Sequence, residues 1–539
     1  MEWDYDVIIV GGGGAGLAAA LMAHKEGASC MIIEADGKLG GATAQSGGVF
    51  YACGTSVQRA AGIANDTPDD LYDYLMTLNR WKLRPDIIRY YADNCGAALE
   101  WLIELGSEFP KEWLVKSGVD TVPRGHSSQG AGSGIADALI NAAGARGIDT
   151  ALGTRVEALL FEDGRVVGVR AMGTELRAPT VIVTTGGFGN SPEMLQRLYP
   201  SACHGEWTWA VHKDVPFVLG DGITLAEKIG AGVVGLDTGL VLATSGFSKS
   251  LEAFLPPWII AVNKEGRRFM SELSPYSVCG YLLNEQTDRR AWAIFDEQAL
   301  VEASANTRYL DPYNAGISIP TWEEPTLREQ VKKGRVKVAD SLVALAAQVG
   351  IDGLALEQTV ARYNTDCDAG GDFQFFKKAP AYFPIRKGPF YAVEIRAAII
   401  GLTAAGLDID RHAPCSMGIS GRFPVCMPRA RCSAASTANV MAVAACPSAT
   451  RWCWGAWPAA RPGRPPLPHA KPKRWPHEAA CRARDSDHRR RPRHGRHHGT
   501  PVSHRGRPRG HRRHHPARRR SPGRRAGRRR DLPAPRRDR

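Results

Sequence analysis

The chain has 539 residues, of which 43% are hydrophobic and 23% charged, and a formal net charge of +14. This length allows two or three domains with a sizeable core, and the charge alone would favour nucleic acid or another acidic partner. The charge is unevenly distributed, because residues 414–539 hold 32 Lys+Arg against 5 Asp+Glu, whereas residues 1–413 hold 37 against 50. The first 413 residues are therefore acidic, and we do not expect nucleic acid as their partner.

The cysteines and the N-terminus bear on the cellular compartment. The first 413 residues hold six cysteines without pairing or metal-ligand spacing, which is typical of a reducing compartment and indicates no metal site. These are Cys30, Cys53, Cys95, Cys203, Cys279 and Cys367. The N-terminal "MEWDYDVIIV" lacks a basic segment, and its apolar run has the length of a strand. We expect a cytoplasmic protein without signal peptide or membrane span.

Residues 5–34 predict a strand, a glycine turn, a helix and a second strand. The β-branched run "YDVIIV" precedes "GGGGAG", an alanine-rich helix follows and ends at Gly27, and "SCMIIE" is the second strand. This order begins a βαβ unit, so it predicts an α/β fold with a parallel sheet.

A dinucleotide-binding pattern lies within this unit. Gly11, Gly13 and Gly16 form G-x-G-x-x-G between the strand and the helix. The first glycine allows the tight turn, the second lets the backbone approach a pyrophosphate, and the third lets helix and strand pack closely. Glu34, at the end of the second strand, is placed to accept hydrogen bonds from a ribose. The alternative is a glycine-rich turn that binds nothing, and the combined context favours a nucleotide.

Later segments extend this organisation. Residues 178–189 repeat the pattern of a strand running into a glycine turn, and residues 156–171 predict a hairpin turning at Asp163-Gly164. Helical periodicity is present in residues 66–78, 93–106, 341–350 and 356–366. Residues 235–375 have a mixed pattern of short strands and helices, which suggests a second domain, and residues 388–410 return to strand-rich character.

Further motifs decide between NAD and FAD, which both use this fingerprint. The stretch "GKLGGATAQSGG", residues 37–48, supplies small residues and backbone amides just beyond Glu34. Here the chain resembles the FAD-binding family of fumarate reductase and succinate dehydrogenase flavoproteins, whose members carry a similar stretch along the flavin. The resemblance spans nearly all of residues 5–413 through "VPRGHSSQGAG", "TVIVTTGGFG", "GDGITLAEKIGA", "NKEGRRFMSE", "AWAIFD" and "GPFYAV". It implies FAD as the cofactor, bound by Gly11, Gly13, Gly14, Ala15, Gly16, Glu34, Gly40, Gly41, Ala42, Thr43, Ser46, Gly47, Gly48, Val156, Thr185, Gly186 and Asp221.

The resemblance also implies an architecture and a reaction. It implies a Rossmann-like FAD-binding domain in two sequence segments, 1–234 and 376–413, with an inserted α+β capping domain at 235–375. The reaction is the interconversion of a saturated carbon–carbon bond with an alkene beside a carbonyl or carboxylate, by hydride transfer with flavin. A protein group then handles the proton at the α-carbon. A small carbonyl compound is the expected substrate, and an external electron donor or acceptor is expected because no haem or iron–sulfur motif is present.

Two family positions bear on the substrate. In fumarate-reducing members an arginine proton donor follows the segment like "GRRFMSE", and a histidine precedes the threonine of the segment like "GLTAAGL". This chain has Pro275-Tyr276 and Leu402 there, so the basic set that would clamp a dicarboxylate is not visible. A fumarate reductase or succinate dehydrogenase type of activity therefore stays as the alternative function.

Four residues are candidates for catalysis. Tyr276 and Tyr391 lie in segments similar to those of the ketosteroid dehydrogenase branch, where one phenol could move the α-proton and the other polarise the carbonyl. For both, packing with a satisfied hydroxyl is the alternative. Arg124 and His126, in a polar glycine-rich loop, would either face the substrate carbonyl or hold the loop.

Residues 414–539 form an Arg/Pro/His-rich tail that we expect to be disordered. Its 32 basic residues include only 2 lysines, a bias that wrong-frame reading of GC-rich DNA produces and a selected basic arm does not require. In a shifted frame Phe423 to Arg431 permit Pro-Gly-Leu-Tyr-Ala-Ala-Gly-Glu, the family's segment at this distance, and the single-codon tryptophans agree.

We therefore predict a break in the reading frame near Ala413, and with it weak retention of FAD by the chain as written. The alternative is a genuine basic arm that binds nucleic acid and makes this a non-catalytic product. Reading the gene across codons 405 to 435 tests the prediction, and an uninterrupted, independently confirmed frame would contradict it.

Overall fold

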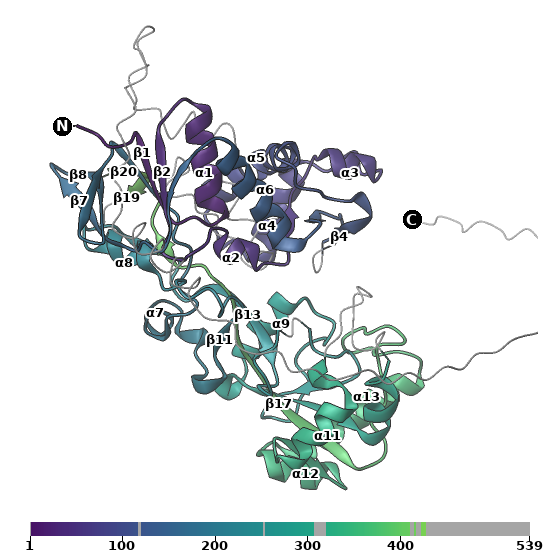
Figure 1. Ribbon diagram of the computed structural model, residues 1–539. Helices are drawn as coiled ribbons and strands as arrows, with labels where there is room; N and C mark the ends of the chain where they lie inside the picture. The colour runs from purple at the N-terminus through teal and green to yellow at the C-terminus, as the bar shows by residue number, and fades with distance from the viewer. Residues whose placement is uncertain are drawn as a thin grey trace, which may run out of the picture. The chain divides into compact units, whose positions relative to one another are not determined.

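The computed structural model describes residues 2–116, 120–251, 254–306, 320–409, 414–416 and 422–426. Residues 427–539, most of the tail for which disorder and a changed frame are predicted, lie outside the described residues. The helices and strands of the described part belong mainly to a parallel sheet with its covering layers and to a second, mostly antiparallel sheet (Figure 1).

The first sheet has the strand order β19-β20-β10-β1-β2-β6, in which β20 to β6 run parallel and β19 is antiparallel to β20. Its strands are β1 (Val7–Val10), β2 (Cys30–Ile33), β6 (Asp149–Ala151), β10 (Thr180–Val183), β19 (Pro414–Ser416) and β20 (Arg422–Cys426). Helix α1 (Gly14–Lys25) connects β1 with β2, which confirms the predicted βαβ unit. Every residue of β1 and β2 is buried, as expected for parallel strands that are covered on both faces.

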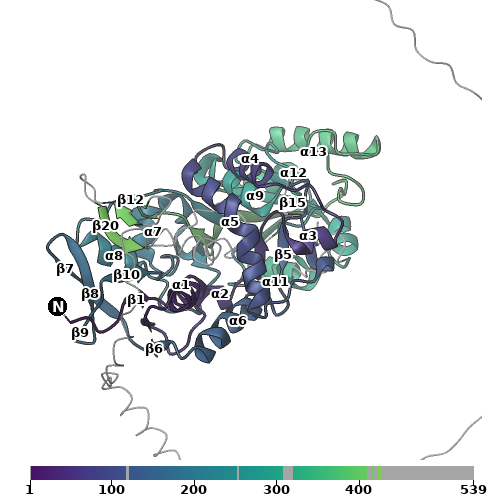
Figure 2. The same cartoon turned by 90° about the horizontal axis from the view of Figure 1, so that it is seen from above.

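Two layers cover this sheet. Helices α1 and α6 (Ala131–Ala145) pack together on one face, and the antiparallel strands β7 (Val156–Glu162), β8 (Arg165–Ala171) and β9 (Thr174–Arg177) pack on the other (Figures 1 and 2). The predicted hairpin is β7–β8, and positive φ angles at Asp163 and Gly164 form its turn.

A smaller group of elements precedes α6. It holds β3 (Val49–Tyr51), β4 (Leu114–Val115) and β5 (Gly125–Ser127), which form one antiparallel sheet, and the helices α2 (Gly41–Ala44), α3 (Ser56–Ala60), α4 (Pro68–Leu78) and α5 (Pro85–Glu104). Helix α5 begins well before residue 93, where the sequence pattern placed the start of a helix. Pro85 explains the difference, because proline at the first helical position has the backbone angle of a helix and lacks an N–H that would stay unpaired there.

The second sheet is organised around β17 (Phe390–Thr403). Most of its other strands come from residues 235–375, for which a capping domain is predicted, so it is named the capping sheet. Strands β11 (Trp209–Ala210), β13 (Gly239–Thr244), β15 (Ala291–Asp296) and β16 (Val336–Ala339) pair with β17, and β14 (Ile260–Val262) pairs with β15. The helices of this region are α9 (Tyr276–Asn284), α11 (Glu324–Lys332), α12 (Leu342–Val349) and α13 (Gly353–Asp368). Because β17 belongs to this sheet, we propose that the chain returns to the first domain after Thr403, whereas the sequence pattern placed that return at residue 376.

Short elements complete the described part. They are α7 (Pro192–Leu198), α8 (Asp221–Glu227), the antiparallel pair β12 (Val233–Val234) and β18 (Gly406–Leu407), single helical turns at Lys111–Trp113, Pro200–Ala202, Gly205–Trp207, Thr287–Arg289 and Pro320–Trp322, and a π-helical turn at Ala299–Ala303. Within the described ranges, no helix has both the length and the hydropathy needed to cross a lipid bilayer.

Candidate functional site

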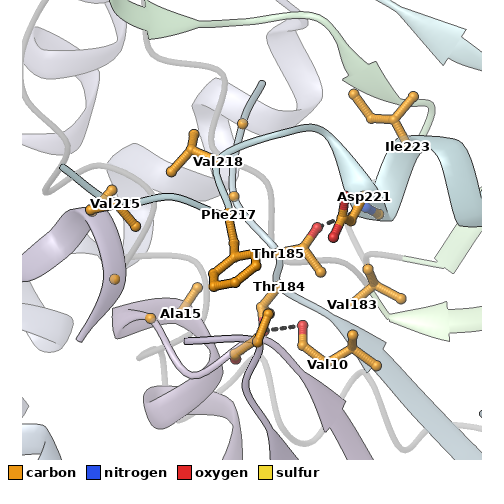
Figure 3. A pocket seen from close by; sticks show the side chains of 18 of the residues that line it. Val10, Ala15, Val183, Thr184, Thr185, Val215, Phe217, Val218, Asp221 and Ile223 are labelled. Carbon is orange, nitrogen blue, oxygen red and sulfur yellow. Dashed lines mark hydrogen bonds between the residues drawn. The ribbon is translucent and has the colours of Figure 1, made fainter. Parts of the chain in front are cut away.

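A cavity follows the edge of the parallel sheet at which β2, β1 and β10 end. The turns after these strands, the N-terminus of α1 and the start of α8 line it (Figure 3). Of the predicted FAD-contacting residues, the lining includes Gly11, Gly13, Gly14, Ala15, Glu34, Gly41, Ala42, Thr43, Val156, Thr185, Gly186 and Asp221. This edge of an open parallel sheet is where dinucleotides bind in α/β folds.

The glycines of the motif divide into two kinds by what surrounds them. A Cβ on Gly13 would meet nothing within 4 Å, although Gly13 lines the cavity and precedes α1. A Cβ on Gly16 would lie 1.9 Å from the Gly11 carbonyl oxygen. Gly16 therefore allows the helix to pack closely against the strand. The space beside Gly13 instead opens into the cavity, where a ligand can occupy it. A pyrophosphate fits there, because the N-terminus of α1 favours anions.

Glu34 lies where a ribose-binding carboxylate is expected. It is 9% exposed, and its Oε2 and Oε1 accept the N–H groups of Gly12 at 2.6 Å and Asp36 at 2.8 Å. Burial raises the pKa of this carboxyl, and the two N–H groups work against that rise. Each oxygen has a further lone pair for a ligand hydroxyl.

The other predicted FAD-contacting residues, Gly40, Ser46, Gly47 and Gly48, do not line the cavity. Gly40 donates its N–H to the Gly12 carbonyl at 2.9 Å, which joins the segment after β2 to the motif. The Ser46 carbonyl accepts the N–H of Gly132 at 3.0 Å, and the Gly48 carbonyl accepts that of Ser128 at 3.0 Å. A Cβ on Gly47, the last of this set, would meet nothing within 4 Å.

At the start of α8, Asp221 pairs with Arg155 at 2.7 Å. Beside it, the N–H of Gly222 donates to the Thr185 hydroxyl at 2.9 Å. These contacts connect the start of α8 to the residue before β7 and to the turn after β10, so the parts of the chain that line this side of the cavity are bonded to one another.

Several lining residues were missed from the sequence. They are Leu402, Thr403, Ala404 and Ala405 at the end of β17, and His212, Val215, Phe217 and Val218 in the loop after β11. Figure 3 shows the Phe217 ring turned toward Thr184 and Thr185. No motif marks this loop, whose outward residues Lys213 and Asp214 are exposed while His212, Val215 and Val218 are buried.

Tyr276 lies at the start of α9 in an apolar cluster that reaches the cavity. The cluster consists of Trp209, Leu240, Leu242 and Ile399, with Val211, Tyr276 and Leu402 packed against it. Leu402 also lines the cavity. Burial raises the pKa of Tyr276, and its hydroxyl makes no hydrogen bond to any residue in the described part of the chain.

Tyr391 lies elsewhere, inside the capping sheet. Its hydroxyl donates to Glu297 at 2.5 Å and accepts from Arg328 at 3.0 Å, and its ring stacks on Phe295. Burial and the Glu297 carboxylate raise the pKa of Tyr391 to about 12. At about 3.3 Å per residue along β17, Tyr391 is roughly 36 Å from Leu402. These observations support a packing role for Tyr391.

Arg124 and His126 are bonded within the fold. Arg124 is 3% exposed and pairs with Asp66 at 2.7 Å and Asp120 at 2.8 Å. Burial opposes its charge, but the two carboxylates outweigh burial and raise its pKa. The His126 Nε2 lies 2.8 Å from the Thr55 hydroxyl, and its Nδ1 lies 2.8 Å from the Arg124 carbonyl. These contacts support the loop-holding alternative for both residues.

Two buried histidines make stability depend on pH. His204 and His212 are each 7% exposed, and burial lowers the pKa of each to about 4. The unfolded chain takes up these protons near pH 6.5, whereas the folded chain takes them up only near pH 4. The free energy of unfolding should therefore decrease as the pH is lowered from about 6.5 to about 4. The expected loss is on the order of 3 kcal/mol per histidine. Urea unfolding at pH 7 and 4.5 measures it, and a His204→Gln variant should lose only part of the difference, because burial also lowers the pKa of His212 and of His126. An identical pH dependence in that variant would contradict the assignment.

Comparison with known proteins shows which family the chain belongs to. The FAD binding domain family matches residues 6–418. The chain is 29% identical over 405 residues to the NADH:fumarate oxidoreductase of Klebsiella pneumoniae, with 73% of this chain and 41% of that protein covered. It is 28% identical over 420 residues to a cytochrome-type fumarate reductase of Shewanella frigidimarina, with 76% and 68% covered.

A solved structure shares the fold. It is that of a 3-ketosteroid-Δ4-(5α)-dehydrogenase from Rhodococcus jostii, with a TM-score of 0.66 and 23% identity, covering 84% of this chain and 98% of that one. The family match over residues 6–418 establishes that the chain belongs to the FAD binding domain family, and with the cavity at the glycine motif it identifies FAD as the cofactor.

Proposed function

We propose that the protein interconverts a saturated carbon–carbon bond and an alkene beside a carbonyl, using FAD. One observation carries this proposal: a single cavity runs from the nucleotide motif to Leu402, in the apolar cluster that includes Tyr276. Bound FAD supplies two-electron hydride chemistry. The fumarate reductases and the 3-ketosteroid dehydrogenase named above act on substrates of this general kind.

Residues of the chain would bind and orient the cofactor and keep water out of the cavity. The N–H groups before α1 would hold the pyrophosphate, and Glu34 would hold a ribose. The buried side chains of Val215 and Val218 lie on the inner side of the loop after β11, where they would exclude water from the cavity.

The apolar cluster favours a substrate with a hydrocarbon skeleton and one carbonyl. Leu402 lines the cavity with an apolar side chain, and behind it lie the buried Trp209, Leu240 and Ile399, against which Tyr276 also packs without itself lining the cavity. A dicarboxylate would need cations at the same place, because an unpaired buried charge is strongly unfavourable. Dicarboxylate reduction remains the second candidate, supported by the names of the two fumarate-reducing relatives.

We assign Tyr276 the proton step. Burial raises the pKa of Tyr276 from its ordinary value, so the phenol is protonated at neutral pH and suited to donate a proton to the α-carbon during alkene reduction. Tyr276→Phe should lower the rate of enone reduction by about 10²- to 10⁴-fold while FAD affinity stays unchanged. Stopped-flow reoxidation of the reduced protein by a cyclic enone measures this rate.

The wild-type rate should stay level from pH 6 to pH 9, because burial raises the pKa of Tyr276 and the phenol keeps its proton across this range. The matched control is Tyr391→Phe, which alters a phenol bonded inside the capping sheet and should leave the rate within about twofold. A Tyr276→Phe rate equal to the wild-type rate would remove Tyr276 from the mechanism.

Electrons would come from or pass to an external carrier. A reducing, cytoplasmic setting agrees with the free thiols of Cys53 and Cys95, whose sulfurs lie 3.9 Å apart.

A further inference from the structure

His212 is a buried imidazole in the cavity, and the described part of the chain supplies no partner for its ring nitrogens. The side chain lines the cavity and is 7% exposed. Its carbonyl accepts from Asn190 Nδ2 at 3.1 Å and from the Val215 N–H at 2.9 Å, but its ring nitrogens make no hydrogen bond to a described residue. These nitrogens are not among the fully buried unpaired polar atoms of the described residues, and the side chain lines the cavity, so a bound ligand can reach them.

Strand register places this imidazole. Ala210 of β11 is opposite Ile400 of β17 in a parallel pair, and the Val211 N–H donates to the Ile400 carbonyl at 3.0 Å. The strand ends in a turn that the Lys213 N–H closes by donating to the Ala210 carbonyl at 3.0 Å, and His212 in this turn lines the same cavity as Leu402 of β17. The His212 Nε2 lies 2.9 Å from the position that a Cβ on Gly189 would take, so the imidazole uses the space which that glycine leaves.

This place is the end of the cavity away from Glu34. The cavity follows the sheet edge from β2 across β1 to β10, and adjacent strands are about 4.8 Å apart. Glu34 follows β2, the pyrophosphate-binding glycines follow β1, and Gly189, beside His212, follows β10. A dinucleotide with its ribose at Glu34 and its phosphates at α1 brings its second ring system to the β10 end.

We infer that His212 binds the isoalloxazine ring of FAD by a hydrogen bond to a polar atom on the ring edge. This inference rests on the proposed FAD function. A neutral imidazole has one N–H donor and one acceptor nitrogen, and the ring edge carries carbonyl oxygens and ring nitrogens that match either group. The burial that lowers the pKa of His212 to about 4 keeps the imidazole neutral at physiological pH.

The inference predicts different effects on stability and on binding. His212→Phe keeps an aromatic ring and breaks no hydrogen bond of the ring to a described residue, so the FAD-free protein should be about as stable as the wild type. The same variant should bind FAD about 5- to 30-fold more weakly and shift the visible absorption maxima and the midpoint potential of the bound flavin. His212→Gln, which retains a donor and an acceptor, should recover most of the affinity.

His204→Phe is the matched control. His204 is also 7% exposed, but its Nε2 lies 3.1 Å from Asn284 Oδ1 and it does not line the cavity. This variant should lose stability and leave FAD affinity and flavin spectrum unchanged.

The experiment is a FAD titration of the full-length wild type and the three variants, followed by spectroelectrochemistry and by urea unfolding without FAD. Equal affinity and equal flavin spectra in His212→Phe and the wild type would overturn the inference, as would an effect confined to substrate binding. A wild type that binds no FAD at saturating concentration would overturn the proposed function together with it, so the two failures are distinguishable.

Discussion

Replacing Gly13 with valine is expected to abolish FAD binding while leaving the fold intact. The residue has φ −71° and ψ −179°, a backbone conformation that valine readily adopts, and its Cβ would meet no protein atom within 4 Å. The added side chain would fill the space through which the backbone approaches the pyrophosphate. We expect affinity to fall by at least about 100-fold, which corresponds to roughly 2.7 kcal/mol.

Fluorescence titration with FAD and urea unfolding of the FAD-free protein measure the two effects. Gly37→Val is the matched control, because a Cβ there also meets nothing within 4 Å but Gly37 does not line the cavity. Gly16→Ala should do the reverse of Gly13→Val and destabilise the fold, since its Cβ would lie 1.9 Å from the Gly11 carbonyl oxygen. A Gly13→Val protein that unfolds, or that binds FAD like the wild type, would contradict this assignment.

Removing the charge of Glu272 is expected to have the largest effect on stability. Glu272 is 2% exposed, and its Oε2 pairs with Arg268 and Lys377, each at 2.9 Å. Asp372 pairs with Arg268 at 2.9 Å, so two cations and two anions balance inside the capping region. Glu272→Gln leaves a buried excess of positive charge, and the expected loss is about 3–5 kcal/mol.

Chemical denaturation monitored by tryptophan fluorescence measures this loss. The control is Glu329→Gln, which weakens an exposed pair with Lys333 and should change stability by less than about 0.5 kcal/mol. Because Glu272 is four residues before Tyr276, partly folded Glu272→Gln protein should also lose activity. A loss below about 1 kcal/mol would show that the buried group is not acting as a charged network.

Local features of the fold were predictable from the sequence. The strand, turn and helix of residues 5–34 follow from β-branched residues, glycines and alanines within one short stretch, and the structure confirms them. The acidic end of β2 was recognisable for the same reason. Sequence spacing suffices where the contacts that define an element lie within the element itself.

Features that depend on contacts between residues far apart in the sequence could not be predicted from it. Nothing near His212 in sequence marks it, because its place in the cavity follows from the pairing of β11 with β17, about 190 residues later. Asp66, one of the two carboxylates that pair with Arg124, is 58 residues away in sequence and approaches it only in the folded chain. Residues 388–410 predicted strands, but only the partners β11, β13, β15 and β16 define the single strand from Phe390 to Thr403.

The most direct test is anaerobic reoxidation of the FAD-loaded, chemically reduced protein. We predict that cyclic enones restore the visible flavin absorbance with a yield of one saturated product per flavin, and that fumarate restores it far more slowly. Failure of every α,β-unsaturated carbonyl compound to restore the absorbance, despite stoichiometric FAD, would contradict the proposed function.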